Sequence, residues 1–411
     1  MSDLDIPHPF SQIPLYPLQY LHASPIHPLP HLSTSATTAA NTKEHTNANK
    51  DGQNPSSHPC INIWCKREDH GSPLACSGNK YRKLEYIVPD ILRQQKDGKT
   101  VTTLVTEGAI QSNHTVQVAS VAAVLGLKAV VLLHKGTGGG LRSTTNPEVF
   151  QNTGNVQVVR MLGAEVRMLE PDESADDKDP VEPILQELRN NGHVPYWIPS
   201  GASLHHLGGL GYARCAFEIA KQERELAQRG TLKGSGQFDY IFVSFGSGST
   251  VSGLIAGFKL LEKTRQQPGN NDDGKQYPKR QVIGIMSSPT KPKPYHEERA
   301  VRFARTAGGM IGLDPQNDIS VDDVRLDDRF VGSAYGQLDP KTNDALNRVA
   351  RVDGLIGDPV YTGKTLRGLL HWVESGEIAR DWSVRGENST ELNVLFIHTG
   401  GQFALAAYSD I

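Results

Sequence analysis

The stretch DYIFVSFGSGSTVSGLIAGFKLL, residues 239–261, contains the pattern that decides the fold. Its apolar first part predicts a buried strand, a Gly/Ser turn follows, and the apolar remainder predicts a helix. Small residues allow the turn to curl around an anion, and Gly248, Ser249 and Thr250 stand where the helix begins. The turn is therefore a candidate cradle for a phosphate monoester. Its spacing matches neither the dinucleotide-binding G-x-G-x-x-G pattern nor the P-loop.

The same alternation of strand and helix continues along most of the chain after residue 60. Helices are predicted at 112–125 and 155–163. Strands are predicted at 100–109, 128–134, 164–169, 194–199, 281–288 and 393–401. Such alternation predicts parallel sheets with helices on both faces, so the fold class is α/β. In these sheets ligands bind beyond the carboxyl ends of the strands, where the polar turns lie.

The N-terminal part of the chain does not follow this alternation. Residues 1–33 are rich in Pro and His but contain apolar anchors, which predicts an extended arm lying on the body of the protein. Residues 34–58 are small and polar without periodicity, which predicts a mobile surface insertion. Residues 266–280 predict a second polar loop, and the sequence GTGGG at 136–140 is unusually rich in glycine.

Composition excludes several classes of protein. The chain has 411 residues, 42 Lys+Arg and 45 Asp+Glu, so its net charge is −3. No basic field is available to attract nucleic acid or anionic lipid, and no apolar run is long enough to span a membrane. The cysteines are too few and too irregular for a disulfide framework or a zinc knuckle, and no metal site is expected. A cytoplasmic enzyme is the expectation; the cysteines are Cys60, Cys65, Cys76 and Cys215.

A group of cations follows the loop GSPLACSGN and precedes an apolar helix. Lys80 and Lys83 lie three residues apart, with Arg82 between them. Neighbouring positive charges favour the neutral amine of a lysine, which is the form that condenses with a carbonyl cofactor. A helix start with solvated basic residues is the simpler interpretation of the segment when it is considered alone.

The segment EGAIQSNH, residues 107–114, joins a predicted strand to a predicted helix. Ser112 is a good N-cap, and Asn113 and His114 follow it in the first turn. The positive end of such a helix offers backbone N–H groups to a carboxylate, and a hydroxyl there can relay a proton. An ordinary N-cap remains the alternative.

Considered together and in order, these segments resemble one family. They are CKREDHGSPLACSGNKYRKLEY, EGAIQSNHTVQVA, GNVQVVRMLGAEV, IPSGAS, DPVYTGKTLRGLL and FIHTGG. The sequence resembles the D-cysteine desulfhydrase and 1-aminocyclopropane-1-carboxylate (ACC) deaminase family, whose members use pyridoxal 5'-phosphate. The resemblance covers roughly residues 24–405, and it implies the fold of the tryptophan synthase β subunit, PLP fold type II, with two parallel-sheet α/β domains and the cofactor in the cleft between them.

The resemblance also implies domain limits and an assembly. Residues 1–98 would form the N-terminal arm and the first part of a large cofactor-binding domain. Residues 99–204 would form the small domain, and residues 205–411 the second part of the large one. A homodimer acting on a small amino-acid substrate is expected from the family alone.

The resemblance assigns roles residue by residue. Lys80 matches the lysine that binds the cofactor covalently and moves the Cα proton, and Asn79 matches the neighbour of the cofactor's phenolic oxygen. The phosphate would be held by Lys83, Gly248, Ser249 and Thr250. The substrate carboxylate would meet Ser112, Asn113 and His114, with Ser112 assisting proton transfer. The substrate side would be lined by Tyr335 and Tyr361, together with Thr399, and Thr362 would meet the pyridine nitrogen.

Thr362 also helps to choose between the two activities of the family. The ACC deaminase branch resembles D-P-V-Y-E-G-K at this point, with a carboxylate that keeps the ring nitrogen protonated and strengthens the electron sink. A threonine supplies no such charge, and the weaker sink still allows loss of a good β leaving group. His114 and the T-G-G at Thr399 also resemble the desulfhydrase branch. The main prediction is therefore D-cysteine desulfhydrase, with ACC deaminase and a non-catalytic PLP- or ligand-binding protein as alternatives.

Overall fold

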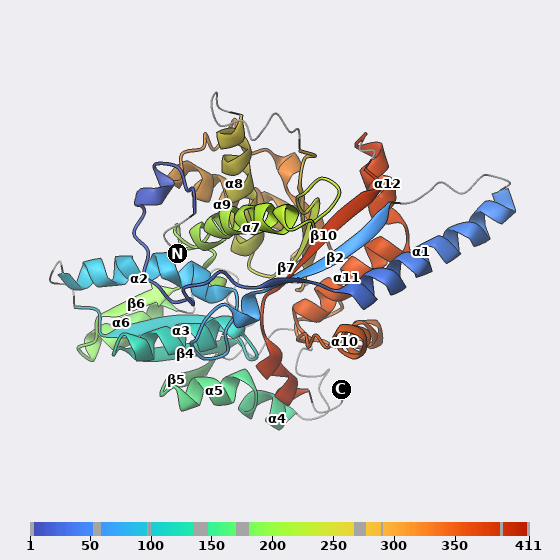
Figure 1. Cartoon of the computed structure of the whole chain (residues 1–411). Helices are drawn as coiled ribbons and strands as arrows, with labels where there is room; N and C mark the ends of the chain where they lie inside the picture. Colours follow the sequence, from blue (N-terminus) through green and yellow to red (C-terminus); the bar gives the residue numbers. More distant parts are fainter. Residues whose placement is uncertain are drawn as a thin grey trace.

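Two sheets form the framework of the protein, which we describe from a computed structural model of the whole chain (Figure 1). The structure describes residues 4–51, 59–96, 98, 100–134, 147–169, 181–266, 277–288, 291–386 and 389–408. The larger sheet has six strands, and only its edge strand β1 is antiparallel to its neighbour. In spatial order these are β1 (Ile26–Pro28), β2 (Cys60–Arg67), β10 (Glu391–His398), β7 (Tyr240–Phe245), β8 (Gln281–Met286) and β9 (Arg325–Asp327).

The smaller sheet has four parallel strands. In spatial order these are β5 (Glu165–Leu169), β4 (Lys128–His134), β3 (Thr103–Ala109) and β6 (Pro195–Ile198). The parallel α/β architecture predicted from the sequence is confirmed in both sheets. All four strands of the smaller sheet lie within residues 99–204, the range proposed for the small domain.

Helices cover both faces of the larger sheet. The side chains of β7 alternate between two apolar clusters: Ile241 and Val243 pack with α7 and α8, whereas Tyr240 and Phe242 pack with α11 and α12. Burial on both faces explains why this strand is a continuous apolar run in the sequence. The helices are α1 (Pro30–Asp51), α2 (Lys80–Lys96), α3 (Asn113–Val124), α4 (Pro147–Asn152), α5 (Asn155–Met161), α6 (Glu182–Asn190), α7 (Leu210–Gln228), α8 (Ser249–Arg265), α9 (Lys293–Met310), α10 (Pro340–Asp353), α11 (Thr362–Glu374) and α12 (Glu377–Val384).

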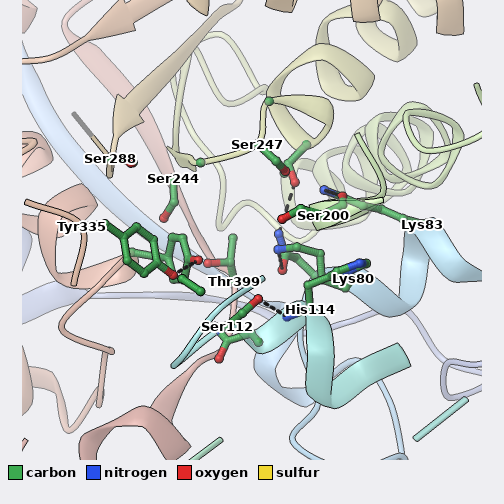
Figure 2. A pocket seen from close by; sticks show the side chains of 18 of the residues that line it. Lys80, Lys83, Ser112, His114, Ser200, Ser244, Ser247, Ser288, Tyr335 and Thr399 are labelled. Carbon is green, nitrogen blue, oxygen red and sulfur yellow. Dashed lines mark hydrogen bonds between the residues drawn. The ribbon is translucent and has the colours of Figure 1, made fainter. Parts of the chain in front are cut away.

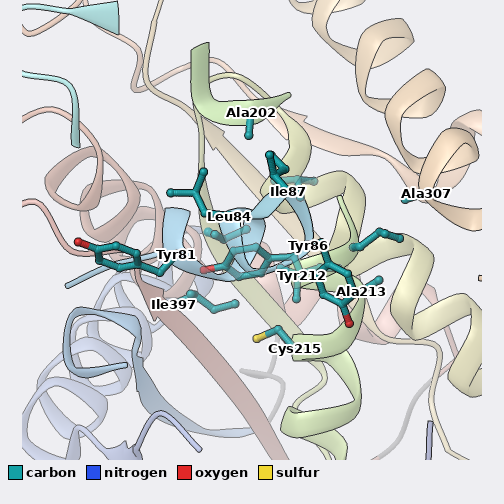
Figure 3. Close-up of a cluster of buried hydrophobic side chains, with 14 of the residues drawn as sticks. Tyr81, Leu84, Tyr86, Ile87, Ala202, Tyr212, Ala213, Cys215, Ala307 and Ile397 are labelled. Carbon is teal, nitrogen blue, oxygen red and sulfur yellow. The ribbon is translucent and has the colours of Figure 1, made fainter. Parts of the chain in front are cut away.

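Helix α2 packs closely against α7 and also contacts α3 of the smaller sheet. Figure 3 shows the apolar cluster at this contact, in which Leu84 and Ile87 of α2 lie beside Tyr212 and Ala213 of α7. A Cβ atom added at Gly211 would lie 2.0 Å from the backbone oxygen of Arg82. Only glycine permits this approach, which fixes the first turn of α2 against the body of the larger domain.

A buried network of charges lies beneath that first turn. The Arg82 guanidinium donates to Glu68 at 2.5 Å and to Glu218 at 2.7 Å, and Lys66 donates to Glu218 at 2.6 Å. Burial alone would raise the pKa of Glu68, but Arg82 and Lys66 hold it below its ordinary value. These pairs join β2, α2 and α7, and the Ser24 hydroxyl of the N-terminal arm also donates to Glu68.

The prediction of a mobile insertion at 34–58 is wrong for its described part. Helix α1 extends to Asp51, and residues 52–58 lie outside the described residues. Leu32, Ala36 and Ala40 are spaced by four residues, and all three are buried where α1 packs on β2, α10 and α11. The backbone N–H of Leu32 donates to Asp353 at 2.8 Å, so the cap comes from the end of α10. Small alanines and a distant capping residue leave no periodicity in the local sequence.

The sequence also predicted an N-terminal arm at 1–33 and a polar loop at 266–280. The arm is confirmed: Phe10 and Leu18 are buried, and β1 pairs with β2. Helix α8 ends at Arg265, but most of the loop predicted at 266–280 lies outside the described residues, as does the glycine-rich stretch 136–140. None of the helices in the described part of the chain is both long and apolar enough to cross a membrane.

Replacing Glu218 with alanine should destabilise the protein by about 3–5 kcal/mol, because Arg82 and Lys66 would remain buried without a counter-charge. Chemical denaturation monitored by circular dichroism measures this change. Glu225→Gln, at an exposed position on the same helix, is the matched control and should leave the unfolding midpoint unchanged. A Glu218→Ala midpoint equal to that of wild type would show that the network contributes no stability.

Candidate active site

A cavity of about 250 Å³ lies where the carboxyl ends of strands from both sheets meet (Figure 2). This volume is close to the lower limit of small-molecule pockets, roughly 300 Å³. The position agrees with the prediction that ligands bind beyond the carboxyl ends of the strands. The strand-end residues that line it are Ala109 at the end of β3, Ser200 and Gly201 after β6, Gly246 after β7, Ser288 after β8 and Thr399 after β10.

All but two of the predicted site residues line this single cavity, although they come from distant parts of the sequence. Their roles remain predictions, but their convergence is a property of the structure. They are Asn79, Lys80, Lys83, Ser112, Asn113, His114, Gly248, Thr250, Tyr335, Tyr361 and Thr399.

The two exceptions are Ser249 and Thr362, which are buried but do not line the cavity. The Thr362 hydroxyl donates to the Asp358 carboxylate at 2.7 Å and accepts from the Asp358 backbone N–H at 2.5 Å. The Ser249 hydroxyl lies 2.9 Å from that of Ser203. The Thr362 hydroxyl thus holds its own turn together, and the Ser249 hydroxyl connects the start of α8 to the loop after β6. The predicted contacts of these two side chains with a ligand stay predictions.

Several lining residues were missed by the sequence analysis. Ser200 and Gly201 belong to the quoted segment IPSGAS, which follows a predicted strand, so their position could have indicated them. Ser244 stands inside a strand, and nothing in the local sequence distinguishes it. The remaining missed side chains are Ser288, His296 and Arg299, and the last two come from α9.

Lys80 is the first residue of α2, and its position is fixed by neighbours on two elements. The Gln117 side chain of α3 accepts the backbone N–H of Lys80 at 2.9 Å, which caps the helix. Its amine donates to the Asn79 side chain at 2.8 Å and lies 6.0 Å from the centre of the Tyr361 ring.

Burial lowers the pKa of Lys80 to about 8, against an opposing effect of Asp358. The sequence analysis predicted this direction but attributed it to neighbouring cations. Desolvation of the amine is the main cause. A substantial fraction of the Lys80 side chains is therefore neutral near pH 8.

Lys83 lies one turn further along α2 and also faces the cavity. Its amine donates to the backbone oxygen of Gly201 at 3.0 Å. Burial, and then the charge of Lys80, hold the pKa of Lys83 well below its ordinary value. An anion at this point would favour the charged form of the Lys83 amine. Arg82, between the two lysines, instead enters the buried network with Glu68 and Glu218.

The start of α3 presents neutral donors to the cavity. Ser112 is the N-cap, as predicted, and its hydroxyl accepts the backbone N–H of His114 at 3.3 Å. The side chain of Asn113 accepts from Asn155 at 2.6 Å, which orients it. Burial and then the charges of Lys80 and Lys83 lower the pKa of His114 well below its usual range, so the imidazole is neutral near pH 7. The helix end can therefore receive a carboxylate without a competing negative charge.

The start of α8 lies beside that of α2. Gly248 adopts φ +108°, which side-chain-bearing residues rarely adopt, and the helix begins at the next residue. The Asn79 amide donates to the Thr250 hydroxyl at 3.2 Å and so joins the two helix starts. The Ser247 hydroxyl lies 2.6 Å from that of Ser203. Backbone N–H groups and hydroxyls at this turn can bind a phosphate.

Two tyrosines lie together at the cavity wall. The hydroxyls of Tyr335 and Tyr361 are hydrogen-bonded to each other, and the ring centres are 6.0 Å apart. Burial raises the pKa of Tyr361 to about 12 and holds the pKa of Tyr335 well above its ordinary value. Both hydroxyls are therefore protonated near neutral pH and can act as donors.

Comparison with known proteins agrees with this geometry. A model of the family described as "pyridoxal-phosphate dependent enzyme" matches residues 52–400. The chain belongs to this family. It is 36% identical over 400 residues to the ACC deaminase of Burkholderia multivorans, covering 97% of this chain and 98% of that protein. It is 37% identical over 350 residues to the probable ACC deaminase of Cryptococcus neoformans, covering 85% and 88%.

A solved structure described as an ACC deaminase homologue has the same fold as this member of the pyridoxal-phosphate-dependent enzymes. The TM-score is 0.69 at 26% identity, and the match covers 98% of this chain and 96% of that chain. The predicted cofactor is thereby confirmed at the level of the family, as is the PLP-enzyme fold.

The residues present fit pyridoxal phosphate. Lys80 supplies a partly buried amine of lowered pKa for its aldehyde, and the α8 turn with Lys83 supplies donors for its phosphate. Among the described residues that line the cavity, none is Asp or Glu, so nothing there repels a phosphate dianion.

The pKa of Lys80 predicts how cofactor attachment depends on pH. Because only the neutral amine attacks an aldehyde, the attachment rate of pyridoxal phosphate to the apoprotein should rise with pH and reach half its maximum near pH 8. Stopped-flow absorbance between pH 6 and 10 measures this rate. Lys80→Ala should give no such absorbance change. A midpoint near 10.5 would show that the amine is not desolvated.

Proposed function

We propose that the protein releases ammonia from a small amino acid by β-elimination, with D-cysteine as the substrate: D-cysteine and water give pyruvate, hydrogen sulfide and ammonia. The observation that carries this choice is the chemistry of the cavity wall. No carboxylate is present among its described lining residues, and the hydroxyl of Ser244 reaches it from β7. The nearby carboxylate of Asp358 is occupied by Thr362 and by three backbone N–H groups.

The residues of the chain would have the following roles in this reaction. Neutral donors at the start of α3 bind the substrate carboxylate and fix the orientation of Cα. The Lys80 amine would accept the Cα proton, and Ser112 would assist this transfer. Bound pyridoxal phosphate supplies the electron sink for the pair released at Cα. Tyr335 and Tyr361 are protonated and can donate to the departing sulfur.

A second candidate is supported by the relatives, which are named ACC deaminases. This reaction would convert ACC and water into 2-oxobutanoate and ammonia. Opening a cyclopropane ring needs a stronger electron sink than losing a thiol, and a carboxylate against the ring nitrogen provides it. The wall of this cavity offers hydroxyls in that role, which is why we rank ACC second despite the names of the relatives.

The substrate can be decided by incubating the holoenzyme with D-cysteine, L-cysteine, D-serine and ACC separately. We expect sulfide and pyruvate in equal amounts from D-cysteine and little keto acid from ACC. Release of 2-oxobutanoate from ACC without sulfide from D-cysteine would establish the second candidate instead. A holoenzyme that gives no keto acid with any of them would favour a non-catalytic binding role. Lys80→Ala serves as the inactive control.

Replacing Ser112 with alanine should lower kcat by about 10²-fold while leaving the cofactor absorbance intact, since general acid–base assistance typically contributes 10²–10⁴-fold. Ser120→Ala removes a buried hydroxyl from the same helix away from the cavity and is the control. Steady-state kinetics with D-cysteine measures both variants. If Ser112→Ala changed only KM, the hydroxyl would bind the substrate without assisting proton transfer.

A further inference from the structure

Two side chains of α9 reach the cavity without a role in the scheme above. Arg299 and His296 lie one turn apart on this helix and both line the cavity wall. His296 is buried, and Arg299 is partly buried. Neither was indicated by the sequence. Within the described structure, neither side chain contacts the start of α3.

Their aromatic neighbours place both side chains beside the turn at Gly248. A Cβ atom on Gly248 would lie 3.3 Å from the Phe245 ring and 3.4 Å from the Phe303 ring. The guanidinium carbon of Arg299 lies 5.1 Å from the centre of the Phe303 ring. The His296 ring lies 5.6 Å from that of Phe245 in an edge-on arrangement. One aromatic ring thus lies between each α9 side chain and the start of α8: the Phe303 ring for Arg299 and the Phe245 ring for His296.

The charge of Arg299 is not neutralised within the described part of the chain. No carboxylate there forms an ion pair with it, and its Nε is buried without a hydrogen-bond partner. A partly buried guanidinium without a counter-ion is costly, and an anionic ligand removes that cost. The cavity next to it provides the space for one.

The three cations of the cavity differ in how firmly they hold their charge. Burial lowers the pKa of both Lys80 and Lys83, so each amine loses its proton more readily than a solvated lysine does. Burial and the neighbouring Arg302 also lower the pKa of Arg299, but a guanidinium starts from 12.5 and stays protonated. Arg299 is therefore the fixed positive charge of this cavity. His296, whose pKa is lowered by burial and by Arg299, is a neutral donor beside it.

We propose that Arg299, assisted by His296, binds the phosphate group of the cofactor from the side of α9. In this arrangement the turn at Gly248 supplies backbone N–H groups and Arg299 supplies the permanent charge. The ligand class is a phosphate dianion, as a monoester or as free phosphate. The inference depends on the cofactor of the family and not on which amino acid is the substrate.

The test is a binding titration of the apoprotein and needs no turnover. Pyridoxal phosphate binding is followed by absorbance for wild type, Arg299→Gln and Arg302→Gln. Arg302 is exposed on the same helix, with its guanidinium 5.6 Å from the Phe303 ring, and is the matched control. We expect Arg299→Gln to weaken binding by roughly 10–100-fold, as for the loss of a charged hydrogen bond, and Arg302→Gln to bind like wild type.

Two further ligands separate phosphate recognition from a general structural effect. Pyridoxal, which lacks the phosphate, should bind wild type and Arg299→Gln equally. Inorganic phosphate should compete with pyridoxal phosphate in wild type and more weakly in Arg299→Gln. Equal pyridoxal phosphate affinity in the two proteins, or an equal loss for pyridoxal, would overturn the proposal. Wild type that binds no pyridoxal phosphate would instead contradict the cofactor assignment itself.

A conservative variant keeps the proposal testable if Arg299→Gln does not fold. Arg299→Lys keeps the positive charge but not the planar fork, so its affinity for pyridoxal phosphate should lie between those of wild type and Arg299→Gln. Circular dichroism confirms that each variant is folded before titration. If Arg299→Gln does not fold, an Arg299→Lys variant that folds and loses the same factor of affinity for pyridoxal as for pyridoxal phosphate would still refute a phosphate contact.

Discussion

The site depends on how the buried carboxylates around the first turn of α2 are distributed. Glu68 and Glu218 bind Arg82 and Lys66 on the side away from the cavity, and Asp358 is occupied by backbone N–H groups and Thr362. Neither Lys83, which is buried, nor Lys80, which is partly buried, has an ion-pair partner among the described residues. Desolvation without compensation lowers the pKa of both amines. The first turn of α2 thus contains Arg82, which is paired with carboxylates, and two lysines, Lys80 and Lys83, which line the cavity and can bind a ligand.

This separation of charges requires close and rigid packing. The contact of α7 with α2 at Gly211 and the apolar cluster of Figure 3 hold the first turn of α2 in place. Gln117 of α3 caps α2, and Asn79 connects it to the start of α8, so elements of both sheets fix one lysine. The starts of α3 and α8 point positive helix ends at the same cavity, which suits the two anionic groups of a cofactor and an amino-acid substrate.

The sequence predicted the parallel architecture because fully buried strands and their polar turns give a strong local signal. It also predicted most of the cavity wall, since the motifs at 78–83, 107–114 and 246–250 stand at strand ends or helix starts. Helix α1 could not be predicted, because its buried face consists of Leu32 and small alanines and its cap is Asp353. The α9 side chains were missed because their meaning depends on the position of Gly248 in space. The hydrogen bonds of the Thr362 hydroxyl to Asp358 within its own turn could not be read from residue identity alone, and its contact with the pyridine nitrogen stays a prediction.

The central claim is that Lys80 is the residue to which pyridoxal phosphate is attached. Reduction of the holoenzyme with borohydride makes this bond permanent, and proteolysis followed by mass spectrometry locates it. The account predicts one labelled peptide, with the added mass on Lys80. A label on Lys83, Lys364 or any other lysine, or no label at all, would contradict it.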